Sequence, residues 1–204
     1  MKDTDTAPRD ALLDAALDMA AESGWSAVSI AAAAERAGIE PQAARRIARG
    51  RAELLVRLTE RVDAAMLESL DADARDPDIS VRDRLFEALM ARLDALAAQR
   101  DGVRAILRGL PRDPLSAIAA APALGRSMAR VLDAIGQSAK PPFGPLKIKG
   151  LAVVWLATLR VWLGDDSDDM AATMKALDQN LARAEEMANS LLPGTRRRGR
   201  PADT

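Results

Sequence analysis

The chain has 204 residues, of which 49% are hydrophobic and 29% are charged, and its formal net charge at pH 7 is −1. The length fits one domain, or a small domain joined to a larger one, and the composition is sufficient for a soluble core. The chain contains no cysteine and no histidine, so disulfides, thiolate metal sites and the commonest catalytic bases and nucleophiles are excluded.

The first three predicted helices have the spacing of a helix-turn-helix. Residues 9–21 carry apolar side chains at helical intervals. Ser29 is a suitable N-cap for a second helix over residues 30–37, because its hydroxyl can accept a hydrogen bond from a free backbone N–H. Gly38 follows where the end of a helix favours a left-handed residue, and Pro41 can begin a third helix at its first position. Two short helices joined by a glycine-containing turn are typical of this motif.

The third helix and the start of the fourth carry a local positive charge. Residues 40–61 contain six arginines and three glutamates, a net charge of +3 in a chain that is nearly neutral. Such a patch is expected of an element that binds nucleic-acid phosphates. Gln42 and Arg46 suit base recognition, since an amide can pair with adenine and a guanidinium with guanine. The residues predicted to contact DNA here are Ser29, Gln42, Ala43, Arg45, Arg46, Arg49 and Arg51.

Residues 9–67 resemble the N-terminal domain of TetR-type bacterial transcriptional regulators. The matching residues are Ala11 to Ala16, Gly24-Trp25, Ser29-Ile30, Ala34, Ala37-Gly38-Ile39 and Leu54-Leu55. Members of that family usually carry a phosphate-contacting tyrosine, an aromatic residue and a lysine where this chain has Arg45, Ala48 and Arg51. The two arginines can still bind phosphates bidentately, whereas Ala48 lacks the apolar anchor that would hold the recognition helix to the core.

The rest of the chain is also predicted to be helical, so the expected fold is all-α and TetR-like, with roughly nine helices. Ser80 and Asp83 resemble a capping box, and Pro122 is expected to restart the chain into a new helix. The polar, proline-containing segments 71–78 and 140–145 are expected to be loops. The further predicted helices are 50–70, 80–98, 101–110, a short one from Asp113, 122–135, 146–163 and 167–192.

The resemblance implies a division into a DNA-binding head, residues 1–50, and a regulatory and dimerisation body, residues 51–192, whose first helix links the two. TetR-like proteins pair through their last two helices into a four-helix bundle. Two heads on a two-fold axis can meet DNA half-sites about 34–36 Å apart. The residues predicted to form the homodimer interface are Leu151, Trp155, Leu159, Trp162, Met170, Met174, Leu177 and Leu181.

A TetR-like body also implies a small effector. Phe86, Met90, Met128 and Trp155 are candidates to line its cavity, and the alternative is that they pack as ordinary core. Because these helices have few polar groups, the ligand is expected to be hydrophobic. No nucleotide-binding fingerprint occurs, so we expect no enzyme and no cofactor. The sequence therefore predicts a TetR-family regulator of double-stranded DNA, most simply a repressor, controlled by an apolar effector.

The segment from Arg160 to Asp178 is similar to the end of the lipid-binding accessory proteins of coenzyme Q biosynthesis, which are TetR-like in fold. This similarity centres on Trp162 to Ser167 and implies an alternative function, lipid handling without operator reading. Aspartates 165, 166, 168 and 169 leave open a Mg²⁺ or Ca²⁺ site built from oxygen ligands alone. The simpler interpretation is that Ser167 caps the last helix and Asp168 and Asp169 favour its positive end, so no metal site is predicted.

The last predicted segment, residues 193–204, is a basic tail. Arg198, Gly199 and Arg200, followed by proline, match the core of an AT-hook, which inserts arginines into narrow A·T minor grooves. A solvated, disordered tail is the alternative. No leader for secretion precedes residue 9, and the apolar stretch 151–159 is too short to cross a bilayer, so we expect a cytoplasmic protein without a membrane span.

Overall fold

The computed structural model describes residues 6–167 and 169–191, and all regular structure in these residues is helical. The α-helices are α1 (Thr6–Ser23), α2 (Ile30–Ala37), α3 (Pro41–Ile47), α4 (Arg51–Ser69), α5 (Val81–Ala97), α6 (Arg100–Gly109), α7 (Pro114–Ala134), α8 (Gly144–Trp162) and α9 (Ala171–Leu191). Short 3₁₀ turns are η1 (Trp25–Ala27), η2 (Ala72–Arg75) and η3 (Leu110–Arg112). The predicted all-α class is confirmed.

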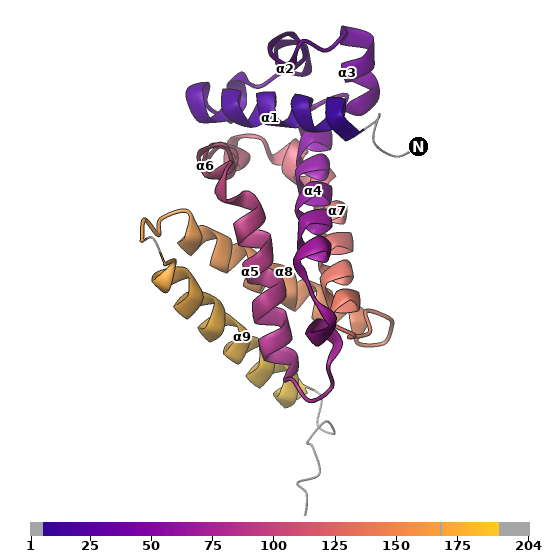
Figure 1. Ribbon diagram of the computed structural model, residues 1–204, viewed down its shortest axis with the longest axis vertical. Helices are drawn as coiled ribbons and strands as arrows, with labels where there is room; N and C mark the ends of the chain where they lie inside the picture. The colour runs from indigo at the N-terminus through magenta and orange to yellow at the C-terminus, as the bar shows by residue number, and fades with distance from the viewer. Residues whose placement is uncertain (1–5, 168, 192–204) are drawn as a thin grey trace, which may run out of the picture.

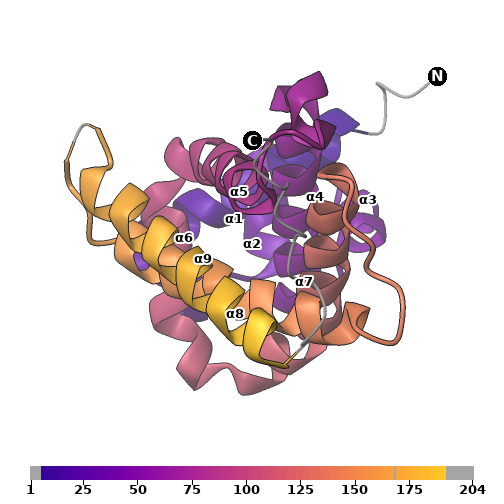
Figure 2. The same ribbon diagram turned by 90° about the horizontal axis from the view of Figure 1, so that it is seen from below.

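The molecule has two parts (Figure 1). Helices α1, α2 and α3 form a head at one end, and α4 runs from that head into the body, where it packs against α5 and α7. Helices α8 and α9 pack side by side along one flank of the body, and the view from below shows the same pairing (Figure 2).

Local chemistry sets the ends of the short helices in the head. The Ser29 hydroxyl accepts a hydrogen bond from the Ala32 N–H at 3.2 Å, as the N-cap prediction requires. Gly38 has a φ of 66°, a left-handed conformation that ends α2 at low steric cost. The Glu40 carboxylate then accepts from the Ala43 N–H at 3.0 Å, with Pro41 in the first turn of α3. These interactions set where α2 ends and α3 begins within the head.

Two glycines of α6 let the head sit close to the body. A Cβ atom on Gly102 would lie 2.6 Å from the Leu17 carbonyl oxygen of α1. A Cβ atom on Gly109, seven residues further along the helix, would lie 2.5 Å from the Cβ of Trp25. Because the absence of both side chains permits this approach, α1 and η1 rest directly on α6.

Several predicted helix boundaries differ from those observed. Helix α1 begins at Thr6 and not at residue 9, and α8 begins at Gly144, inside the segment 140–145 that was expected to be a loop. Helix α7 continues through Pro122 instead of restarting there. Pro122 and Ile118, four residues before it, are both exposed, so water can bind the Ile118 carbonyl that the proline leaves without a backbone donor. Helix α9 begins at Ala171, not at 167, and Ser167 does not cap it. The Ser167 hydroxyl instead donates to the Asp165 carboxylate at 2.5 Å.

Candidate nucleic-acid interface

The orientation of α3 is set by its two buried residues. Ala44 and Ile47 are 0% and 7% exposed, and they hold the helix against the head core. Gln42 and Arg46 lie four residues apart on the opposite, exposed face, and Arg45 lies beside them. Ala48 is fully buried, and Ile47 supplies the apolar anchor that the alanine was expected to remove.

Three arginines of this region have free guanidinium groups. Within residues 6–167 and 169–191, no hydrogen bond, ion pair or ring contact engages the side chain of Arg45, Arg46 or Arg49, all of which are exposed. Arginines elsewhere are commonly paired, as Arg61 is with Asp14 at 2.5 Å. Cations left without an internal partner on one face retain all their donors for an external anion.

A hollow of about 600 Å³ lies beside this face. It is lined by Val28, Ser29, Ile30, Ala31, Arg45, Arg49, Gly50 and Arg51. The hollow therefore meets the first residues of both α2 and α4, whose backbone N–H groups carry partial positive charge. Helix N-termini combined with arginines are the donors that proteins commonly use for phosphates.

Arg51 differs from the other arginines of the hollow because it already has partners. Its Nε lies 2.9 Å from Asp113 Oδ2 in an ion pair, and its Nη1 donates to the Ser26 carbonyl at 3.2 Å. The guanidinium carbon lies 5.9 Å from the centroid of the Trp25 ring. Arg51, predicted as a DNA contact, is therefore half-buried at the joint between head and body.

Most of the residues predicted to form a dimer interface belong to the core of a single chain. Exposed fractions of 6% or less are found for Leu151, Trp155, Leu159, Trp162, Leu177 and Leu181. Met170 is half-buried and Met174 is 36% exposed. The helical spacing was correct, but it marked the face that packs inward, so these six side chains have little surface left for a second chain. The large apolar side chains that α8 and α9 expose are Leu146, Val153, Leu156, Val161, Met174 and Met187.

The predicted effector-binding residues do not line either described hollow. Met128 and Trp155 are buried, and Phe86 and Met90 are half-buried against the core. The second hollow, about 230 Å³, lies between α1 and the start of α6. The structure therefore packs these four side chains as core, which was the alternative interpretation.

A buried polar cluster that sequence reasoning missed lies beside them. Asp63 of α4 is 2% exposed and accepts hydrogen bonds from Arg92 Nη1, from Ser127 Oγ at 2.5 Å and from Arg130 Nη1 at 2.8 Å. The Arg92 guanidinium stacks on the Trp155 ring, 4.8 Å from its centroid. Burial lowers the pKa of Arg92, and the carboxylate of Asp63 opposes this effect. The sequence did contain a signal for this cluster: Asp63 and Arg92 are charged residues among the apolar residues that line the inward faces of α4 and α5.

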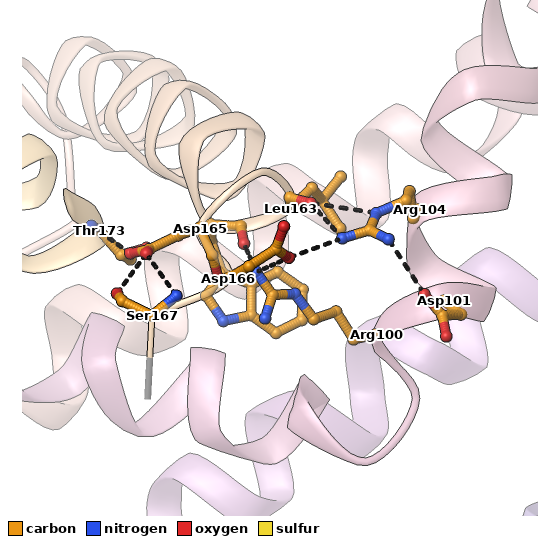
Figure 3. A network of polar contacts seen from close by, with 9 residues as sticks. Arg100, Asp101, Arg104, Leu163, Asp165, Asp166, Ser167 and Thr173 are labelled. Atoms are coloured by element: carbon orange, nitrogen blue, oxygen red, sulfur yellow. Dashed lines mark hydrogen bonds and ion pairs between the residues drawn. The ribbon is translucent and has the colours of Figure 1, made fainter. Parts of the chain in front are cut away.

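The turn between α8 and α9 is held by α6 (Figure 3). Arg100 donates to the carbonyls of Trp162 and Asp165 and stacks on the Trp162 ring, and Arg104 Nη2 donates to the Leu163 carbonyl at 2.5 Å. The Asp165 carboxylate accepts from the Thr173 N–H at 2.7 Å and from its hydroxyl at 2.6 Å.

Hydrogen bonds from Ser167 and Thr173 lower the pKa of Asp165 well below its usual value. The Asp165 carboxylate therefore stabilises this turn. Asp168 lies outside the described residues, and among those described no three potential ligands converge on a metal site. The tail residues Arg198, Gly199 and Arg200 also lie outside the described residues. In the described part of the chain, no helix combines the length and apolar character needed to span a membrane.

The head, the linking helix α4 and the α8–α9 pair together define the fold of TetR-type transcriptional regulators. The chain is similar to a TetR transcriptional regulator from Nitrosomonas europaea, with 26% identity over 87% of this chain and 98% of that one and a TM-score of 0.66. It is also similar to one from Rhodococcus sp. RHA1, with 18% identity over 88% and 96% of the two chains and a TM-score of 0.62. These neighbours are regulators and not enzymes. No protein-family model and no curated protein matches the sequence.

Proposed function

We propose that this protein is a TetR-type transcriptional regulator that binds double-stranded DNA through α3 and the hollow beside it. The observation that carries the proposal is the set of three exposed guanidinium groups, on Arg45, Arg46 and Arg49, that no described residue pairs. The similarity to the Nitrosomonas regulator supports it, because that chain is matched over almost its whole length.

The positions of these side chains suggest separate tasks. Gln42 and Arg46 project from the face of α3 opposite its buried residues, where base edges in a major groove would lie. Arg45 and Arg49 line the hollow together with the first residues of α2, so they would bind the phosphate backbone. Gln42 would then select adenine and Arg46 guanine.

Operator recognition of this kind uses two heads, so we propose a homodimer. The surface that supports it is the exposed apolar face of α8, where Val153 is 68% and Leu156 is 47% exposed, together with Met174 and Met187 on α9. Burial of such side chains is the main favourable term in association. Pairing there would carry both heads on one side of a DNA duplex.

Fluorescence titration with DNA from upstream of the protein's own gene, at two salt concentrations, tests the regulator. Arg46→Ala should weaken specific binding by about 1–3 kcal/mol and reduce discrimination against scrambled DNA. Arg126→Ala is the matched control, since it removes an equal charge from an exposed position on α7. Equal effects of the two substitutions would contradict reading by α3.

Repression and control by a small apolar effector extend this proposal. The described hollows lie away from Phe86, Met90, Met128 and Trp155, so effector binding there would require the body to open. Mass spectrometry of ligands extracted from the purified protein tests this part. A bound apolar compound that lowers DNA affinity supports it, and a ligand-free protein with constant affinity counts against it.

The second candidate function is lipid handling of the kind seen in coenzyme Q biosynthesis. Its support is the segment from Trp162 to Ser167. In the structure, however, Trp162 is 1% exposed beneath Arg100, and Asp165 is bound within the turn, so these residues have a structural role that needs no lipid. Co-purification of an isoprenoid lipid, without any preference among DNA sequences, would favour this candidate.

A further inference from the structure

The hollow beside α3, here called the DNA-side hollow, is lined by Arg45, Arg49 and Arg51. Among the described residues, Arg51 alone of these three forms an ion pair, and its partner is Asp113. Asp113 is far away in sequence and belongs to the body: it is the N-cap of α7 and accepts the Ser116 N–H at 3.4 Å. Arg51 itself is attached to the head through the Ser26 carbonyl. The ion pair therefore joins the two parts of the molecule at the edge of the DNA-side hollow.

The surroundings of this pair connect it rigidly to both parts. Trp25, whose ring lies beside the Arg51 guanidinium, is 2% exposed and packs directly on Gly109 at the end of α6. Three residues of η3 then lead to Asp113. A displacement of α6 or of the start of α7 would consequently change the distance between the carboxylate of Asp113 and Arg51.

Asp113 is ionised under the conditions in which proteins bind DNA. Burial raises the pKa of its carboxyl, but the hydrogen bonds from Ser116 and the charge of Arg51 outweigh this, and the pKa lies below its ordinary value. A carboxylate and a phosphate oxygen compete for the same guanidinium donors. The carboxylate also adds a negative charge close to the path of a phosphate backbone.

We propose that Asp113 acts as an internal substitute for a DNA phosphate: it occupies Arg51 and so lets the body set how many phosphates the head can bind. The inference rests on the proposed function. While the Arg51–Asp113 pair is closed, Arg51 contributes little to DNA affinity. When α7 moves away, Arg51 gains a phosphate contact.

The test is Asp113→Asn, measured by fluorescence titration of the full chain with its upstream DNA over a range of salt concentrations. Asparagine is an equally good N-cap of similar size, so the substitution removes the charge and retains α7. Binding should tighten about threefold or more, and the slope of log affinity against log salt should steepen by about 0.9. Asp133→Asn, at an exposed position near the other end of α7, removes an equal charge far from the hollow and should change neither quantity.

The same substitution in an Arg51→Ala background separates the possible outcomes. In that background Asp113→Asn should not change the salt slope, because the Arg51 guanidinium that the substitution would release is absent. Weaker binding or an unchanged slope in the single variant would overturn it, since Asp113 would then only orient Arg51. Failure of the proposed function looks different: wild type and Arg46→Ala would bind upstream and scrambled DNA alike. Circular dichroism melts of each variant exclude unfolding as the cause.

Discussion

The buried cluster around Asp63 predicts an asymmetric response to mutation. Asp63→Leu is nearly isosteric and leaves the Arg92 guanidinium, which is 1% exposed, without its carboxylate inside the core. Arg92→Met fills a similar space and leaves Asp63 with two donors, Ser127 and the half-exposed Arg130. The first change strands a buried charge, whereas the second removes one.

The expected magnitudes follow from that difference. Breaking a buried ion pair so that a charge remains costs about 3–5 kcal/mol, so we expect this loss for Asp63→Leu. For Arg92→Met we expect about 1–2 kcal/mol, because one charge-assisted hydrogen bond is lost while the cost of burying the guanidinium disappears. The double variant should be less destabilised than Asp63→Leu alone, since two apolar groups then pack together.

Urea denaturation followed by circular dichroism measures the free energy of unfolding of all three variants. Tryptophan fluorescence provides a second probe, because the Arg92 guanidinium stacks on the ring of Trp155, one of the three tryptophans of the chain. The reasoning is refuted if Arg92→Met costs as much as Asp63→Leu, or if the two losses add in the double variant.

Three further predictions concern packing, pH and assembly. Gly109→Ala should destabilise the chain by about 1–3 kcal/mol, because the added methyl group forces Trp25 away. Gly150 has open space around it, so Gly150→Ala should stabilise α8 by up to about 1 kcal/mol. Thermal melts compare the two variants. The lowered pKa of Asp165 means that its stabilisation is present above the pKa of an unfolded aspartate and is lost as pH falls through and below it. Asp165→Asn should therefore be less stable at neutral pH and show a weaker loss of stability on acidification, measured by denaturation at several pH values; parallel curves for wild type and variant would disprove this. Leu156→Glu should shift sedimentation towards a monomer, while Leu67→Glu, at an exposed position on α4, should not; a monomeric wild type would rule out the proposed pairing.

The head was predicted closely because its structure depends on short-range chemistry. Ser29, Gly38 and Pro41 act on backbone groups within a few residues of themselves, so their roles can be read from adjacent letters. The orientation of α3 followed from the same local pattern. The sequence could not show that the arginines of this region lack ion-pair partners, since this depends on which acidic residues the fold brings close to them.

In the body, the helices were predicted, but the sequence did not show which residues cover each helix face. Trp155 and Trp162 recur at helical spacing, and that spacing shows that they share a face without showing what covers it. The fold covers the first with Arg92 and the second with Arg100, both from other helices. The two tryptophans, which were predicted to form a dimer interface, are thus buried by contacts within one chain.

Most helix positions, the caps of the head and the all-α class depend on neighbouring residues, so the sequence itself is sufficient to specify them. The partners of charged side chains are not: Asp63 meets Arg92 and Arg51 meets Asp113 across long stretches of chain. Those contacts arise only when packed helices bring distant residues together. For that reason the fold, and not the sequence pattern, decided which arginines of the head remain without a partner among the described residues.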